Sequence, residues 1–445
     1  MMKPLFEKSR PLFDRAMKLR RELAWVLFGQ VLCFVGGFLG IKVLTNVMGP
    51  KGYGQLALGL TIAGIFTTYV YGPVANVVAR FFSVYRERGD LGTYFAVLKR
   101  SHCQLATVLA IIALVVAGIA GESAGHEWFL IVLLASLFGI VSGINASYLS
   151  LQSAIRQRKI VALHQGADVW LRIGISIVLL MVWSNRGHFA LLGYLLGTLF
   201  VTLSQALYAL RNAEIKRYWR VDEADEKKRA CFREFSNYAA SFMIFSGFAA
   251  ISLYADRWVL QGVFGESAVG IYSAIYQIAA SPVNLFFAMV NQLVVPIVFE
   301  RAGAMTTSAQ ADSSAALVRQ TIAFSCVVMA AVTLFAYFFG EPLILLLTTK
   351  AFATQSSVLW LTVVGLAIYN IGQLYSLKGL YCNQPKIYFW PKGLQAVSFL
   401  LIAFGLVKFI GIPGVALALF ASSILYLISV LIVNNRIRFV FNDRC

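Results

Sequence analysis

Long apolar runs recur along the whole chain and restrict its fold more than any other feature. A helix that crosses a bilayer needs about 20 apolar residues. Twelve runs of about this length are predicted, at residues 24–48, 54–79, 101–120, 128–150, 160–183, 188–210, 237–262, 268–298, 316–339, 355–381, 387–408 and 412–433. Only 13% of the 445 residues are charged, which is about half the share in soluble proteins. An all-α polytopic membrane protein is therefore predicted, and neither a disordered chain nor a small disulfide-linked module fits.

The basic residues are divided unevenly between the two sides of these spans. With the N-terminus inside, 29 Lys and Arg residues fall in cytoplasmic loops and tails, against four on the other side. Cytoplasmic loops of membrane proteins carry such an excess, so both termini are predicted to be cytoplasmic. This bias accounts for most of the net charge of +18, and no nucleic-acid partner is needed to explain it.

A long polar segment divides the predicted spans into two sets of six. Apolar residues at helical spacing within 4–20 predict a short helix in the headgroup plane, and the charged run 221–229 predicts a solvated loop. The predicted organisation is a cytoplasmic N-terminal segment, a six-helix bundle, a cytoplasmic connecting segment, a second six-helix bundle and a cytoplasmic tail, at residues 1–23, 24–210, 211–236, 237–433 and 434–445.

The two predicted bundles share an internal repeat. Residues 43–54 align with residues 259–270 without a gap, and five residues are identical at a constant offset of 216. A second set of matches, at an offset of 227, joins the fourth span with the tenth. Because each half has an even number of spans, a pseudo-two-fold axis along the membrane normal is predicted. Transporters built in this way bind their substrate between the halves, near the midplane, and rock around it.

Two motifs in these segments resemble those of the bacterial polysaccharide flippases. They are Val43-Leu44 with Gly49-Pro50 and Tyr53-Gly54, and Asp256-Arg257 with Gly265 and Gly270-Ile271-Tyr272. This family belongs to the multidrug, oligosaccharidyl-lipid and polysaccharide exporter superfamily. The resemblance implies a flippase that turns an undecaprenyl-diphosphate-linked oligosaccharide, an O-antigen or exopolysaccharide unit, from the cytoplasmic to the periplasmic leaflet of the inner membrane. It also implies membrane lipids and other membrane proteins of polysaccharide assembly as partners.

A flippase of this kind needs a wet path through the bilayer, because an unpaired polar group in hydrocarbon costs several kcal/mol. Cations within the spans are the leading contacts for a diphosphate. Lys42 is one, although its side chain could instead snorkel to the interface. Asp256 and Arg257 are the second site. As neighbours they lie about 100° apart on a helix, so they are expected to pair with other groups or water, not with one another.

The fifth span carries His164, Asp168 and Arg172 on one stripe, at steps of four residues. An acidic and a basic residue at this spacing often form an internal ion pair, which is the favoured interpretation. A role of Asp168 or His164 in coupling transport to protons is the alternative.

Several other polar residues within the spans are predicted to line the path. In the second span Gly72-Pro73 predicts a kink, followed by Asn76 and Arg80. Arg80 is interpreted as an anchor for a lipid phosphate or as a contact for the diphosphate on entry. In the eighth span, amides recur on one face at seven-residue steps, and they suit either sugar hydroxyls or contacts between helices. These amides are Gln277, Asn284 and Asn291, and Lys378 in the tenth span is a further predicted substrate contact.

No cofactor, metal site or enzymatic activity is predicted. The six cysteines and four histidines lack the spacing of a disulfide framework or a zinc site, and no phosphate-binding Gly-rich motif lies in a polar segment. A cation-coupled multidrug antiporter and a lipid II flippase remain as alternatives within the same superfamily. The first would favour buried carboxylates, yet residues 23–85 contain no Asp or Glu. A membrane glycosyltransferase or polymerase is disfavoured, because the predicted outer loops are too short to build a catalytic site.

Overall fold

The computed structural model describes residues 3–218, 224–302, 308–382 and 384–437, and within these ranges the chain is helical, without strands. The all-α class is therefore confirmed. The elements are α1 (Lys3–Ile65), a π-helix η1 (Phe66–Tyr71), α2 (Gly72–Glu87), α3 (Leu91–Ala124), α4 (His126–Ala154), α5 (Arg158–Val182), α6 (Gly187–Arg211), α7 (Ala213–Tyr218), α8 (Asp225–Ala302), α9 (Ser308–Leu347), α10 (Lys350–Ala353), α11 (Val358–Tyr381), a 3-10 helix η2 (Pro385–Tyr388), α12 (Phe389–Ile410) and α13 (Ile412–Arg436).

Ten helical stretches within the described residues are long and apolar enough to cross a membrane. Two of them exceed the length of one crossing by far, since Arg20–Glu87 has 68 residues and Phe242–Ala302 has 61. A crossing takes about 20 residues, so each of these two stretches has room for two crossings. With that allowance the ten stretches accommodate the twelve predicted spans.

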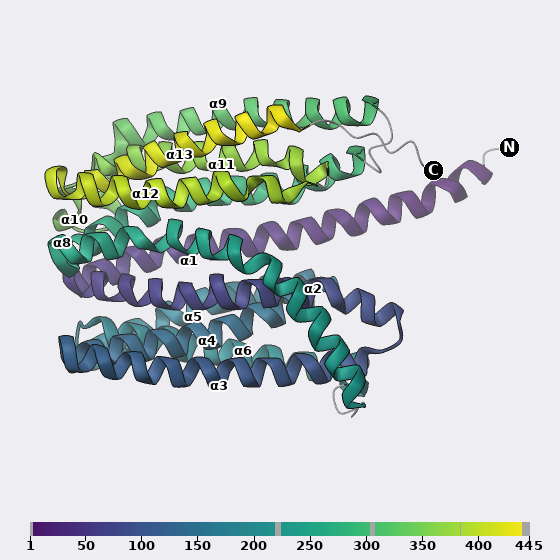
Figure 1. Ribbon diagram of the computed structural model, residues 1–445, viewed down its shortest axis with the longest axis horizontal. Coiled ribbons are helices and arrows are strands. Elements are labelled where there is room, and N and C mark those ends of the chain that lie inside the picture. The colour runs from purple at the N-terminus through teal and green to yellow at the C-terminus, as the bar shows by residue number, and fades with distance from the viewer. Residues whose placement is uncertain (1–2, 219–223, 303–307, 383, 438–445) are drawn as a thin grey trace. The chain divides into compact units, whose positions relative to one another are not determined.

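The chain forms two compact units, each built from long helices packed side by side. The first comprises Met1–Gly40, Ile62–Ser184 and His188–Met243, and the second comprises Ile41–Thr61, Asn185–Gly187 and Ile244–Cys445. In the first unit α4 packs against both α2 and α3. In the second unit α13 packs against α11 and α12, and α11 also packs against α9, as Figure 1 shows for these four helices.

The two longest helices each turn at a glycine with a positive φ. Gly49 in α1 has φ 64° and ψ −177°, and Gly265 in α8 has φ 73° and ψ −172°. A residue with a Cβ atom rarely adopts this conformation. The two glycines occupy equivalent positions of the repeat at offset 216. We call the repeated segments, residues 43–54 and 259–270, the first and second elbow.

The two elbows contact one another through their backbones, with a glycine on each side. A Cβ atom placed on Gly54 would overlap the carbonyl oxygen of Glu266, and one placed on Gly270 would overlap the carbonyl oxygen of Pro50. Pro50 and Glu266 are themselves equivalent in the repeat, so the contact is reciprocal. Small residues allow helix backbones to approach this closely in membranes, and here both glycines are required.

A buried amide strengthens the same crossing. The side chain of Gln55 donates a hydrogen bond to the Glu266 carboxylate at 3.1 Å and accepts one from the backbone N–H of Gly187 at 3.0 Å. Gln55 is only 3% exposed, and a buried amide is stable only when its polar atoms are paired. It therefore links the first elbow both to the second elbow and to the start of α6.

The predicted break at Gly72-Pro73 takes the form of a π-helical turn. Residues Phe66–Tyr71 adopt the wider π geometry immediately before α2 begins at Gly72. Proline lacks an N–H donor, and its ring clashes with the carbonyl of the preceding turn. Widening that turn relieves the clash without ending the helix.

The structure changes two expectations about the polar segments. The N-terminal residues are helical from Lys3, but they continue within α1 into the first span and do not form a separate short helix. Asp225–Arg229 begin α8 and are not a loop, while residues 221–223 lie outside the described residues. Asp225 and Glu226 in the first turn favour a helix N-terminus, and Lys228 pairs with Asp225 at 3.6 Å.

Replacing either crossing glycine with alanine should destabilise the protein by about 3 kcal/mol, because the added methyl group meets a backbone atom that cannot rotate away. The variants Gly54→Ala and Gly270→Ala should lower the midpoint of thermal unfolding in detergent. Gly262→Ala is the matched control, since a Cβ atom there meets nothing within 4 Å. Equal midpoints for all three variants would show that the elbows are not held by this contact.

Candidate functional site

Two neighbouring charged residues of α8, Asp256 and Arg257, form a buried ion pair just before the second elbow. Asp256 is 2% exposed and Arg257 is 8% exposed. The Arg257 Nη1 atom donates to both carboxylate oxygens of Asp256, at 2.8 and 2.7 Å. The expectation that these neighbours cannot pair is therefore wrong. The long arginine side chain folds back around the helix and so spans the angle that separates the two Cα–Cβ bonds.

Aromatic side chains from beyond the second elbow complete this site. The Tyr272 hydroxyl donates to Asp256 Oδ2 at 2.9 Å, and the Arg257 guanidinium carbon lies 4.3 Å from the centre of the Tyr276 ring. Arg257 also donates to the carbonyl oxygen of Leu253 at 2.7 Å. The Tyr272–Asp256 hydrogen bond and the contact of Arg257 with the Tyr276 ring thus join the parts of α8 before and after Gly265.

A second ion pair lies in the first unit, within α5, and a hydroxyl of α6 bonds to it. Arg172 donates through Nε to Asp168 Oδ1 at 3.0 Å and through Nη2 to Oδ2. The Thr198 hydroxyl donates to Asp168 at 2.8 Å, and the guanidinium lies 4.9 Å from the centre of the Phe138 ring. The arrangement matches the internal ion pair favoured for this spacing, with Asp168 7% exposed.

The structure gives His164 different partners from those of Asp168. His164 Nδ1 lies 2.9 Å from the Ile160 carbonyl oxygen, and Nε2 lies 3.2 Å from the Ser204 hydroxyl. A ring nitrogen facing a carbonyl oxygen must carry a proton, so Nδ1 is the donor and Nε2 accepts from the hydroxyl in the neutral ring. The proton-coupling role of this stripe stays a prediction.

The remaining predicted site residues fall into two groups. Lys378 is half-buried, and its ammonium donates to the carbonyl oxygen of Asn434 at 2.9 Å, which ties the end of α11 to the end of α13. The others lie exposed on helices of membrane length; they are Lys42, Asn76, Arg80, Gln277, Asn284 and Asn291.

Sequence reasoning missed several polar residues that the structure brings to these sites. Asn46 is exposed one turn beyond Lys42, and its side chain donates to the Lys42 carbonyl oxygen at 2.6 Å. Gln55 directly follows the first elbow and bonds to the second, and Tyr276 contacts Arg257. A polar side chain within an apolar span was the available signal for Asn46 and Gln55. Among the described residues no cluster of His, Cys, Asp and Glu side chains could hold a metal ion.

If the Asp256–Arg257 pair stabilises the fold, replacing one partner should lower the free energy of unfolding strongly. Replacing the second partner as well should then add little further loss. Asp256→Asn leaves a buried guanidinium without its counter-charge, which should lower the free energy of unfolding by about 3–5 kcal/mol. The double variant Asp256→Asn/Arg257→Gln should lose less than the sum of the single losses, measured by thermal unfolding in detergent. Strictly additive losses would contradict the pairing.

Solved structures of membrane transporters share this fold. The lipid II flippase MurJ, in an inward closed conformation, is similar with a TM-score of 0.68 and 15% identity, over 92% of this chain and 86% of that chain. An inward-facing multidrug resistance MATE family transporter of the MOP superfamily is similar with a TM-score of 0.61 and 15% identity, over 92% of this chain and 94% of that chain.

Sequence comparison adds a relative and a family. An uncharacterized membrane protein of Haemophilus influenzae is 23% identical over 293 residues, which are 64% of this chain and 66% of that protein. The chain thus spans just under two thirds of the length of this curated relative. The profile of a family described as polysaccharide biosynthesis protein matches residues 19–301. More than half of the chain is matched, and with its membrane-spanning helices the protein is a multi-pass membrane member of the polysaccharide biosynthesis protein family.

Proposed function

We propose that the protein is a flippase that moves an undecaprenyl-diphosphate-linked oligosaccharide across the bacterial inner membrane, from the cytoplasmic to the periplasmic leaflet, by alternating access. The substrate is an O-antigen or exopolysaccharide repeat unit. Membership of the polysaccharide biosynthesis family supports the substrate class, and the fold shared with a lipid II flippase supports the type of transport.

The observation that carries this proposal is a stripe of exposed amides on α8. Gln277, Asn284 and Asn291 follow one another at seven-residue steps, which keeps them on nearly the same face of a helix, and all three are exposed. On another face of the same helix Val283 and Val290 are buried. Polar groups at membrane depth face a bundle interior or a water-filled cavity and not lipid, so the stripe is suited to a wet path.

The chemistry of the exposed groups fits a glycan attached to a diphosphate. Amides donate to and accept from sugar hydroxyls, and the ammonium of Lys42 and the guanidinium of Arg80 attract phosphate. The inside-negative membrane potential also favours outward movement of an anion. Two uncompensated charges crossing 100 mV would gain about 4–5 kcal/mol.

The buried carboxylates bear on the competing function. A multidrug resistance MATE family transporter shares this fold. A cation-coupled multidrug antiporter would need a carboxylate free to bind a cation. Asp168 and Asp256 are each paired with an arginine. This pairing, together with the lack of acidic residues in 23–85, favours an anionic substrate over a cationic drug.

The amide stripe is tested by Asn284→Leu in liposomes that contain a defined polyprenyl-diphosphate oligosaccharide. Losing hydrogen bonds to the sugar should slow transport at least about tenfold, the equivalent of 1.4 kcal/mol, while the protein stays folded because the residue is exposed. Gln320→Leu, an exposed amide on α9, is the control and should transport normally. Unchanged transport by Asn284→Leu would remove the stripe from the path.

The cationic contact is tested separately by Lys42→Gln, with the exposed Lys408→Gln as its control. A hydrogen bond to a charged group contributes about 1.5–3 kcal/mol, so Lys42→Gln should slow transport of the diphosphate-linked glycan by roughly ten- to a hundredfold. The same liposomes should be tested with lipid II and with a cationic dye. Transport of either, without transport of the oligosaccharide, would establish the corresponding alternative function.

A further inference from the structure

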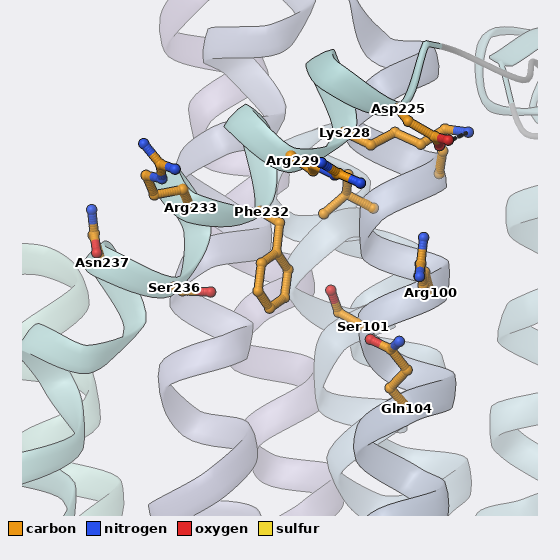
Figure 2. Close-up of a pocket in the computed structure, with 12 residues that line it drawn as sticks. Arg100, Ser101, Gln104, Asp225, Lys228, Arg229, Phe232, Arg233, Ser236 and Asn237 are labelled. Carbon is orange, nitrogen blue, oxygen red and sulfur yellow. Dashed lines mark ion pairs between the residues drawn. The ribbon is translucent and has the colours of Figure 1, made fainter.

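A groove lies between α3 and the first turns of α8, in the part of the first unit formed by segments that are predicted to be cytoplasmic. Its volume is about 680 Å³, which falls within the range of ligand pockets in proteins. Figure 2 shows Phe232 of α8 extending toward Ser101 of α3, with Arg229 and Arg100 on one side of the ring and Arg233 on the other.

The groove carries an excess of positive charge. Its lining includes the cations Arg100, Lys228, Arg229 and Arg233 and a single acidic residue, Asp225. Asp225 pairs with Lys228 at 3.6 Å, so the three arginines are not balanced by acidic lining residues. An anion that enters the groove would meet guanidinium groups, which bind phosphate through paired hydrogen bonds.

The acidic residue next to Arg233 belongs to a different contact. The Glu234 carboxylate accepts a hydrogen bond from the Tyr85 hydroxyl at 2.8 Å and one from Arg88 Nη1 at 3.2 Å. Both partners lie at or just after the end of α2. This contact neutralises Glu234 and fastens the first turns of α8 to α2, so the carboxylate does not offset the charge of the groove.

The cationic groove continues into an apolar one of about 350 Å³ between α2, α3 and α8. The two share the lining residues Ser101, Gln104, Phe232 and Ser236. Beyond them the walls are aliphatic and aromatic, and include Val74, Val77, Leu105, Val108 and Phe235. The combined shape therefore has a charged end, a polar junction and an apolar end.

The wall of the groove is held in place by close packing. The Phe235 ring lies 5.0 Å from the ring of Phe81 and 5.8 Å from that of Tyr94, measured between ring centres. Cys231 is buried in the same cluster, and burial raises the pKa of its thiol to about 11. The groove is thus formed by the folded unit itself and does not need a ligand to shape it.

We propose that this groove binds the phosphate of an anionic lipid at Arg100 and Arg229 and holds the hydrocarbon chain of that lipid along its apolar end. The hydroxyl of Ser101 and the amide of Gln104 lie at the junction, where the polar linkage of a lipid would sit. The site does not include Lys42 or the α8 amide stripe, and its existence does not depend on the proposed transport function. Two lipids carry the required chemistry: a membrane phospholipid and a polyprenyl phosphate.

The proposal is tested by native mass spectrometry of the full-length protein in neutral detergent. Phosphatidylglycerol, undecaprenyl phosphate, phosphatidylcholine and inorganic phosphate are added separately. One of the two anionic lipids should bind, and Arg100→Gln/Arg229→Gln should weaken that binding at least tenfold. The control Lys216→Gln/Arg217→Gln removes the same charge from exposed positions on α7 and should bind as the native protein does.

The apolar end is tested with Ser236→Trp, which fills the junction, against Ala240→Trp, an exposed position that lines neither part of the groove. Only Ser236→Trp should reduce binding. Slow alkylation of Cys231 at pH 8, followed in its tryptic peptide, checks that each variant keeps α8 packed.

The preferred lipid identifies the source: phosphatidylglycerol indicates a bilayer phospholipid, and undecaprenyl phosphate indicates the glycan carrier. Equal binding of phosphatidylcholine, inorganic phosphate bound as tightly as the lipids, or equal losses in the groove and control variants would each overturn the proposal. Because binding is measured without transport, failure here leaves the flippase proposal intact, and failure of the liposome assay leaves this one intact.

Discussion

The backbone contact between the two elbows is the constraint on which the second unit depends. Gly54 and Gly270 each present bare backbone to a carbonyl oxygen of the other elbow, and Gln55 adds a buried hydrogen bond to Glu266 beside them. In a bilayer the hydrophobic effect does not drive helices together, so close packing and interhelical hydrogen bonds must do so. Both are present at this crossing, and the turns at Gly49 and Gly265 bring the helices to it.

Most of the fold could be predicted because its signals are local. Apolar runs of bilayer length marked the spans, and Gly72-Pro73 marked the π-helical turn at Phe66–Tyr71. The offset of 216 aligned Gly49 with Gly265, although the repeat alone did not reveal that both adopt a positive φ. The continuation of α8 back to Asp225 was missed, because a charged run is equally compatible with a loop and with the exposed first turns of a helix.

The candidate site was less predictable because it depends on side-chain reach and on distant partners. Asp168 and Arg172 pair at a spacing that helix geometry favours. Asp256 and Arg257 pair against that geometry, because an arginine is long enough to return to its own neighbour once Tyr272 and Tyr276 enclose it. No pattern along the chain joins residues 256 and 276 across a glycine turn. Likewise, the basic residues of α3 and α8 were assigned to membrane orientation, and only the fold gathers them around one groove.

The reciprocal glycine contact also limits which residues the two elbows can accept. Only five of the twelve aligned elbow positions are still identical, and both Gly54 and Gly270 are among them. Neither glycine faces a side chain that could shrink to accept a substitution, since the opposing atoms are main-chain oxygens. No substitution at a neighbouring position can therefore make room for a side chain at either glycine. An elbow position that faces a side chain can change if that side chain becomes smaller. The last residue of each elbow is therefore fixed as glycine by main-chain geometry alone, independently of the side chains around it.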